Sequence, residues 1–149
     1  MKFLMVDQII AWKANQSISG IKAVSFEEYC LRTPLGYEES LPESLLTQSF
    51  IHLAEWLVIL SSDFQTIGFP EEIENIRFFS SLRPGQKMHL SLWASSCTNN
   101  EIMINGEGFV QKQPVAEIAG LKMRLLPLED YCDPPDVRTL FSEIFKPLP

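Results

Sequence analysis

Residues 45–60 are strongly apolar and have the spacing of a helix, and this stretch constrains the fold more than any other feature of the sequence. Apolar side chains recur there at intervals of three and four, as they do along one helix face. Pro42 suits a first helical position, because its missing N–H would lack a partner there in any case. Gln48, His52 and Glu55 interrupt the apolar residues, which argues against a membrane span. We therefore predict a buried central helix.

The apolar period changes to two from Asn75 onward, which is the period of a strand. Strands are predicted over 76–79, 87–95, 101–112 and 115–126 after the helix, with turns at 83–85, 99–100 and 113–114. Before the helix, residues 18–26 are predicted as a strand and residues 3–12 as a strand or a short opening segment. Residues 27–39 have the composition of a loop, and 136–145 could form a short final helix. Short connections make the strands after the helix an antiparallel meander.

One long helix and an antiparallel sheet that could wrap around it make an α+β layout. At 149 residues the chain suits one domain, because two tandem domains would each have a marginal core. The 46% of hydrophobic residues exclude a mainly disordered chain, and the net charge of −7 disfavours a nucleic-acid binder. A single helix cannot cover both faces and edges of such a sheet, so pairing with a second copy is expected.

The cysteines and histidines predict neither a metal site nor a disulfide framework. Cys30, Cys97 and Cys132 are odd in number and widely spaced, and His52 and His89 lie at no useful spacing from them. Reduced thiols in a cytoplasmic protein are the simple interpretation. The opening residues reach an aspartate too soon for a signal peptide. We expect no metal and no cofactor.

Several short motifs together carry a family resemblance. They are Phe3–Asp7 (FLMVD), Ile21–Val24 (IKAV), Leu41–Pro42, Asn75–Phe78 (NIRF), Arg83–Gln86 (RPGQ) and Val115–Glu117 (VAE). In order and spacing they resemble the β-hydroxyacyl-acyl carrier protein dehydratases, the FabA/FabZ-like hotdog proteins. The resemblance implies a hotdog fold, a helix wrapped by an antiparallel sheet, usually built as a dimer. It covers about residues 3–126, so we expect a hotdog domain over 1–126 and a C-terminal extension over 127–149.

The catalytic pair of that family is missing from this sequence. The family uses a histidine in a G-H-F-P loop as the base and a glutamate one turn into the helix as the acid. Anchored on Leu41–Pro42, the resemblance puts Pro34 in the position of the histidine and Gln48 in that of the glutamate. Proline offers no base, and glutamine has no proton to exchange near neutral pH. The resemblance therefore implies an atypical or degenerate active site.

A polar line along the helix is a partial substitute for the missing pair. Gln48 and His52 are four residues apart and share one helix stripe, with Glu55 close to it. In one interpretation Gln48 orients a substrate and His52 acts as the base. In the other, these side chains form hydrogen bonds inside the core or across a dimer seam. His52 lies one helical turn, roughly 5–6 Å, beyond Gln48, which occupies the family's catalytic position on the helix. This displacement favours the second interpretation for His52, because a proton-transfer group must lie within hydrogen-bond reach of the substrate. His89 is expected on a strand face.

The start of the helix is the other candidate for substrate binding. Its first N–H groups lack intrahelical partners and carry partial positive charge, so they could polarise a thioester carbonyl. We expect Leu41, Pro42 and Glu43 to bind substrate, with Tyr37 from the preceding loop. Glu43 replaces the glycine that the family has after this proline. Its carboxylate could obstruct the pocket or stabilise the helix dipole from solvent.

Charge is distributed unevenly along the chain and bears on the partner. Residues 27–74 hold ten acids and one base, whereas residues 75–124 hold six bases and three acids. Because acyl carrier proteins are acidic, a docking patch would come from the basic part, with Arg77, Arg83, Lys87 and Arg124 as its candidates. Ordinary solvated strand charges are the alternative.

Three functions follow from these observations. The first is binding of an acyl thioester of an acyl carrier protein or coenzyme A, related to 3-hydroxyacyl dehydration, in fatty-acid or polyketide-type metabolism. The second is a non-catalytic hotdog subunit, in a homodimer or paired with an active relative. The third is a hotdog thioesterase, because such sites also use the helix start and a polar helix residue.

Overall fold

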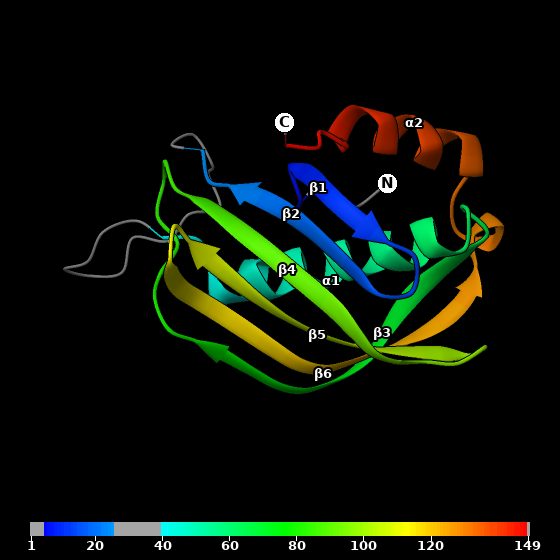
Figure 1. The fold of residues 1–149 in the computed structure, drawn as a ribbon, viewed down its shortest axis with the longest axis horizontal. Coiled ribbons are helices and arrows are strands. Elements are labelled where there is room, and N and C mark those ends of the chain that lie inside the picture. Colours follow the sequence, from blue (N-terminus) through cyan, green and yellow to red (C-terminus); the bar gives the residue numbers. More distant parts are fainter. Residues whose placement is uncertain (1–4, 26–39, 149) are drawn as a thin grey trace.

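The computed structural model describes residues 5–25 and 40–148. The elements in these residues are, in order, β1 (Gln8–Lys13), β2 (Ser17–Ala23), α1 (Glu43–Ser61), β3 (Thr66–Phe78), β4 (Lys87–Cys97), β5 (Glu101–Val110), β6 (Gln113–Pro127), the 3-10 turn η1 (Leu128–Asp130) and α2 (Pro134–Ile144). The strands form one antiparallel sheet in the order β1-β2-β4-β5-β6-β3, which curls around α1 (Figure 1). This confirms the α+β layout of a central helix wrapped by a sheet.

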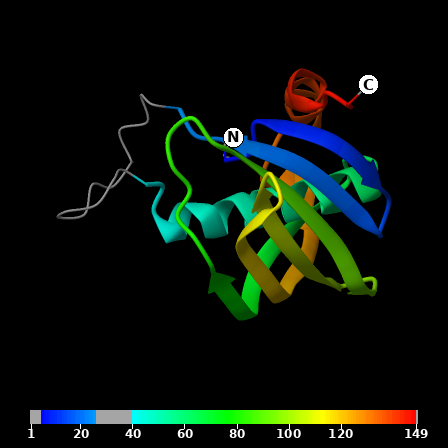
Figure 2. The ribbon, with the colours of Figure 1, turned by 60° about the vertical axis from the view of Figure 1, so that its left-hand side comes forward.

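Helix α1 is the core of the molecule, as its apolar spacing predicts. Phe50, Leu53, Trp56 and Leu57 have no exposed surface, and α1 lies along the inner side of the curled sheet (Figure 2). By length and hydropathy, α1 is the one helix among the described residues that could cross a membrane, but most of it is buried within the fold. Its apolar residues are accounted for by the sheet that surrounds it.

The predicted strand at 76–79 is wrong in its length. Strand β3 begins ten residues earlier and runs for 13 residues, from Thr66 to Phe78. The pairing of β3 with β6 shifts register between Pro70 and Glu72, and the exposed glutamates of this segment hide any alternation. A proline and a bulge are typical of an edge strand, which β3 is.

The predicted four-strand meander is also wrong, because only β4, β5 and β6 follow one another in the sheet. Strand β3 pairs with β6, whereas β4 pairs with β2, so the chain crosses between separate strands over residues 79–86. Buried Leu82 lies in this crossing, and its carbonyl accepts a 2.8 Å hydrogen bond from the Leu41 N–H. The curl of the sheet brings its two halves close enough for so short a connection.

One of the three predicted turns is misplaced. Gln113 and Pro114 are the first residues of β6, and the chain reverses at Gln111 and Lys112, where Gln111 has a φ of 57°. A positive φ at a residue other than glycine leaves no sequence signal as clear as proline. The turns at 83–85 and 99–100 lie where they are predicted.

An ion pair joins the first two motifs of the family resemblance. Lys22 Nζ lies 3.8 Å from Asp7 Oδ2, and the Lys22 side chain is only 5% exposed. The same Asp7 oxygen accepts a 2.7 Å hydrogen bond from the Ala23 N–H. A buried ammonium needs a charged partner, so the lysine requires an acid at this position. The FLMVD and IKAV segments are therefore coupled by charge.

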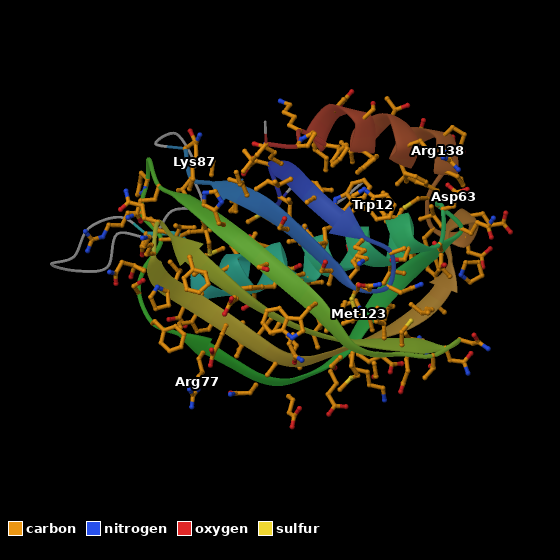
Figure 3. The ribbon with its side chains drawn as sticks, in the orientation of Figure 1. Trp12, Asp63, Arg77, Lys87, Met123 and Arg138 are labelled. Atoms are coloured by element: carbon orange, nitrogen blue, oxygen red, sulfur yellow. The ribbon has the colours of Figure 1, made fainter. Side chains whose placement is uncertain are left out.

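The C-terminal residues pack against the rest of the fold. Helix α2 spans Pro134–Ile144, where the apolar spacing predicted 136–145, and its Phe141 ring lies 5.9 Å from Trp56 of α1. Arg138 bonds to the Asp63 carboxylate at 3.4 Å (both are labelled in Figure 3). The Lys146 N–H then donates to the Ile9 carbonyl at the edge of β1. The boundary proposed at residue 126 stays a prediction.

Candidate functional site

The start of α1 presents unpaired backbone N–H groups. Pro42 is extended, with φ −57° and ψ 144°, and its carbonyl accepts hydrogen bonds from the N–H groups of Leu45 and Leu46. Helix geometry leaves the N–H groups of Glu43 and Ser44 without intrahelical acceptors, and within residues 5–25 and 40–148 no side chain caps the start of the helix. These groups carry the partial positive charge of the helix dipole. The helix start is therefore suited to an anion or a polarised carbonyl.

A cavity of about 670 Å³ adjoins this helix start. Its walls come from the helix start and from the end of β3 with the residues after it: Ser40, Leu41, Pro42, Glu43, Ser44, Leu46, Phe78, Phe79, Ser80 and Ser81. The Phe79 ring is half exposed. The cavity has the volume of small-molecule sites, and polar and apolar residues contribute about equally to its lining.

Three of the four residues predicted to bind substrate line this cavity. They are Leu41, Pro42 and Glu43, whereas Tyr37, together with Pro34, lies outside the described residues. Leu41 is buried and Glu43 is exposed. An exposed carboxylate in a first turn stabilises the helix dipole from solvent, which favours that interpretation of Glu43.

The polar line Gln48, His52 and Glu55 lies away from this cavity, whose described walls include none of the three. Gln48 is exposed, one turn beyond the lining residue Ser44. His52 is half buried, and its Nδ1 accepts a 3.4 Å hydrogen bond from the Met5 N–H. Burial lowers the pKa of His52, so the neutral imidazole with its proton on Nε2 fits this contact.

Glu55 is partly buried and lies near Cys132, in the segment that leads into α2. Burial raises the pKa of its carboxyl from the usual 4.5 to about 7. Cys132, just before α2, has its own thiol pKa raised by burial and by the nearby Glu55 charge. The sequence places Glu55 close to the polar stripe, and in the structure it lies near Cys132, which is beyond the family resemblance. Of the two interpretations of the polar line, the geometry of His52 and Glu55 favours interior contacts.

The sequence analysis did not predict the cavity wall that is formed by the end of β3 and the residues after it. Phe79, Ser80 and Ser81 line both this cavity and a second one of about 930 Å³. The second cavity is further lined by Arg83, Gly85, Gln86, Lys87, His89, Val110, Gln111, Gln113, Pro114 and Val115. The consecutive aromatic residues Phe78 and Phe79 at a strand end were the available signal, since one of them extends past the end of the strand.

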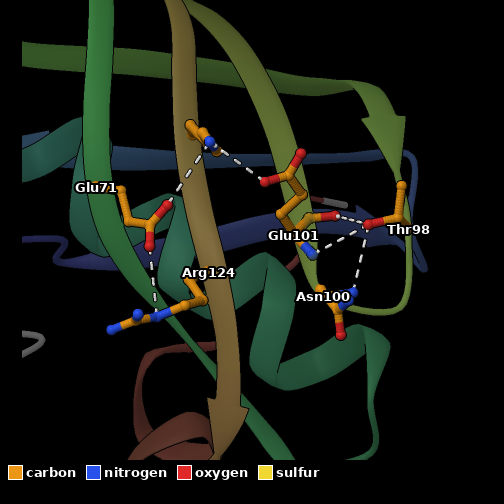
Figure 4. A network of polar contacts seen from close by, with 6 residues as sticks. Glu71, Thr98, Asn100, Glu101 and Arg124 are labelled. Atoms are coloured by element: carbon orange, nitrogen blue, oxygen red, sulfur yellow. Dashed lines mark hydrogen bonds and ion pairs between the residues drawn. The ribbon is translucent and has the colours of Figure 1, made fainter.

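The structure separates the four predicted docking residues into two pairs. Arg77 contacts Glu117 at 3.5 Å, and Arg124 contacts Glu71 at 3.4 Å on the outer sheet face. Lys122 forms ion pairs with both Glu71 and Glu101, and these contacts are drawn as dashed lines in Figure 4. Arg83 and Lys87 instead line the second cavity. His89 is exposed on β4, the strand-face position expected for it.

No group of three or more His, Cys, Asp or Glu side chains with the arrangement of a metal site occurs in residues 5–25 and 40–148.

Comparison with known proteins identifies similar sequences and the fold. No family model matches the sequence. A 3-hydroxyacyl-acyl-carrier-protein dehydratase FabZ of Paramagnetospirillum magneticum is 28% identical over 123 residues, which are 77% of this chain and 73% of the relative. A protein of the same name from Rickettsia typhi is 33% identical over 90 residues, 59% of this chain and 62% of the relative.

Solved structures agree in fold. A Streptococcus mutans protein bound to acetyl coenzyme A superimposes with a TM-score of 0.61 at 9% identity, over 80% of this chain and 86% of the other. A hypothetical thioesterase with coenzyme A from Streptococcus pneumoniae gives 0.62 at 10% identity, over 80% and 85%. The curled sheet around a central helix is thus the hotdog fold. Within that fold the chain is similar to the FabA/FabZ-like dehydratases, the family that its motifs resemble.

Proposed function

We propose that this protein binds an acyl thioester, carried by coenzyme A or an acyl carrier protein, in the cavity at the start of α1. The relatives that support this are named 3-hydroxyacyl-acyl-carrier-protein dehydratases, and a protein with the same fold has acetyl coenzyme A bound. The role in fatty-acid or polyketide-type metabolism is proposed from the same relatives.

One observation carries the proposal: the first residues of α1 line this cavity. A thioester carbonyl oxygen there could accept hydrogen bonds from the N–H groups of Glu43 and Ser44, which have no intrahelical partner. Leu41, Leu46 and Phe78 supply apolar surface for the acyl chain. Oriented backbone donors in a partly desolvated cavity stabilise negative charge on such an oxygen.

We further propose that the site binds its ligand without 3-hydroxyacyl dehydration. Dehydration needs a base and an acid within hydrogen-bond reach of the substrate. Gln48 cannot deliver a proton, and His52 Nδ1 is directed to the Met5 N–H. Gln48 retains a proposed role at the rim, one turn along α1 from Ser44, where its amide could orient a substrate.

Filling the cavity tests the binding site. Ser44→Trp, at an exposed position in the cavity wall, is expected to lower acetyl coenzyme A affinity at least tenfold, because the indole occupies the ligand volume. Ser142→Trp, at an exposed position on α2, is the matched control and should bind like wild type. Titration calorimetry measures both variants. Equal affinity for wild type and Ser44→Trp would reject this location.

A substrate panel distinguishes binding from catalysis. Enoyl and acyl thioesters of short and long chains are assayed for hydration and for release of free thiol, with wild type, Gln48→Ala and His52→Ala. We expect no hydration, and we expect His52→Ala to bind thioesters with unchanged affinity. Hydration that disappears in His52→Ala would instead establish the relocated dehydratase site. Thiol release would establish a thioesterase, the activity in the name of one structural neighbour.

A second chain is proposed to pair along β3, with a homodimer as the expected assembly. Strand β3 is the last strand of the sheet order and is 13 residues long. Such an edge leaves N–H and C=O groups available to another strand, and exposed Phe69 lies on it. Sedimentation equilibrium should give twice the mass of one chain. A monomer mass at all concentrations would contradict the homodimer and leave a related hotdog chain as the partner to seek.

We also propose a cytoplasmic location. Cys97 and Cys132 are free thiols in the structure, which fits a reducing compartment.

A further inference from the structure

A small groove lies on the outer face of the sheet, apart from the two cavities near the start of α1. Its volume is about 220 Å³, and strands β3 to β6 line it through Asn75, Trp93, Asn105, Gly106, Glu107, Glu117, Ile118 and Ala119. None of these residues is among the described lining of the other two cavities. Figure 1 looks onto this face, with α1 behind the sheet and α2 beyond β1, so neither helix covers the groove.

Trp93 forms the aromatic wall of the groove. It is 41% exposed on β4 and lies directly opposite Asn105 of β5. The Asn105 side chain is fixed, because its Oδ1 accepts a 2.9 Å hydrogen bond from the Gly120 N–H. Gly120 has a φ of 65°, and the pairing of β5 with β6 shifts register beside Asn105. A bulge re-aims side chains, and this one holds a polar wall beside the exposed indole.

Two carboxylates face each other in the groove. Glu107 of β5 lies directly opposite Glu117 of β6, and like charges in that arrangement destabilise a sheet. Arg77 pairs with Glu117 at 3.5 Å and so relieves that carboxylate. Glu107 has no ion-pair partner in residues 5–25 and 40–148, although Trp93 is its diagonal neighbour on β4. A local conflict in an otherwise consistent sheet is expected at a functional site.

The same chain twice holds an arginine against an aromatic ring and a carboxylate. The Arg138 guanidinium lies 4.3 Å from the centre of the Phe64 ring, and Asp63 pairs with it at 3.4 Å. Arg124 lies 5.9 Å from the centre of the Phe69 ring and pairs with a glutamate at 3.4 Å. The groove offers the same two partners, a ring and a carboxylate, without a lysine or arginine among its described lining residues. Its chemistry therefore matches a guanidinium group from outside the chain.

We propose that this groove binds one arginine side chain of a separate protein, with the guanidinium stacked on Trp93 and paired with Glu107. Tryptophan is the aromatic side chain that attracts cations most strongly. Arginine suits the site better than lysine, because its planar group both stacks on a ring and donates two parallel hydrogen bonds to a carboxylate. The groove is smaller than the roughly 300–1,000 Å³ of small-molecule sites, so it fits a single side chain. This contact is independent of thioester binding at the α1 start.

Charge favours a separate basic protein over a second copy of this chain as the source of the arginine. The net charge of −7 attracts a basic surface and steers it toward the molecule. Arg77, Arg124 and Arg138 each pair already with a carboxylate of their own chain. A second copy would have to break such a pair to supply one of these three side chains.

The test titrates three blocked tripeptides into isotope-labelled protein and follows the indole and backbone signals by NMR. The peptides are acetyl-Gly-Arg-Gly-amide, its lysine counterpart and its citrulline counterpart, in which a neutral urea replaces the guanidinium. The groove variants are Trp93→Leu and Glu107→Gln. Their matched controls are Trp12→Leu, at 38% exposure, and Glu143→Gln, exposed on α2, neither of which lines the groove. Wild type and controls should bind the arginine peptide about tenfold more tightly than the other two peptides, and the groove variants should lose that preference.

The peptides and variants separate the possible outcomes. If wild type binds none of the peptides, or binds the citrulline peptide as tightly as the arginine peptide, a cation site is rejected. Equal affinity for the lysine peptide rejects the choice of arginine. A preference for arginine that survives in Glu107→Gln places the contact elsewhere. If Glu107→Gln sediments with a lower mass than wild type, a second copy supplies the arginine, which contradicts a separate protein.

Thermal unfolding distinguishes this binding role of Glu107 from a structural one. Glu107→Gln removes one of two opposed like charges, so its unfolding midpoint should be at least as high as that of wild type. A lower midpoint would make the carboxylate a structural group of the sheet and count against the proposed contact.

Discussion

Replacement of Trp56 by alanine is expected to lower the free energy of unfolding by about 3–5 kcal/mol. Trp56 has no exposed surface and lies between the sheet-wrapped core and the Phe141 ring of α2. Its removal leaves a cavity in the centre of the molecule and takes away the surface on which α2 packs. Phe141 also stacks on Phe145 and contacts Phe64, so the loss should spread through this aromatic cluster.

Urea unfolding of wild type and Trp56→Ala, followed by far-ultraviolet circular dichroism, measures this effect. Tyr131→Ala is the matched control, because Tyr131 is an aromatic residue between η1 and α2 with 60% of its surface exposed. Its expected change is within about 0.5 kcal/mol. A Trp56→Ala transition midpoint equal to that of wild type would show that α2 does not share a core with α1.

Glu55→Gln is expected to stabilise the protein above neutral pH by about 3 kcal/mol. Burial raises the pKa of Glu55 from 4.5 to about 7, so the folded state holds this proton more tightly than the unfolded chain does. The stability that the protonated carboxyl contributes is complete below pH 4.5 and is lost as the pH rises to about 7. Glutamine stays neutral throughout, so the variant keeps that stability at higher pH.

The measurement is the free energy of unfolding at pH 4 and at pH 8. Wild type and Glu55→Gln should be similar at pH 4 and differ at pH 8. Glu129→Gln, at an exposed position in η1, controls for the general loss of one negative charge. A difference between wild type and Glu55→Gln that is the same at both pH values would mean that Glu55 is not desolvated in solution.

Local patterns in the sequence were enough to predict the core helix and most strands. The spacing of Leu46, Phe50, Leu53 and Leu57 predicts the buried face of α1, because burial against a surrounding sheet demands that spacing. The family motifs add the topology that periodicity cannot supply. Asp7 and Lys22 show how two such motifs act together, since the buried Lys22 ammonium is paired with the Asp7 carboxylate.

Features that depend on neighbours distant in sequence could not be predicted in the same way. The length of β3 is concealed by Pro70 and Glu71, because an edge strand tolerates residues that a central strand would exclude. The neighbours of Glu55 in the fold include Cys132, more than seventy residues later in the sequence. The cavity at the α1 start likewise combines residues 40–46 with residues 78–81. Each of these features arises from tertiary packing.

The way the chain end meets β1 also limits how large an assembly can grow. Gln8 and Ile9 of β1 are bonded to Lys146, and Ile9 forms a parallel bridge with Phe145. The rest of β1 is short and ends in Lys13, a residue that discourages strand addition. Among the described strands this leaves β3 as the long open edge, so two copies joined there have no second edge with which to continue. The C-terminal segment thereby prevents another strand from adding to the β1 edge. Its loss would leave that edge open to fibre-like polymerisation through β1.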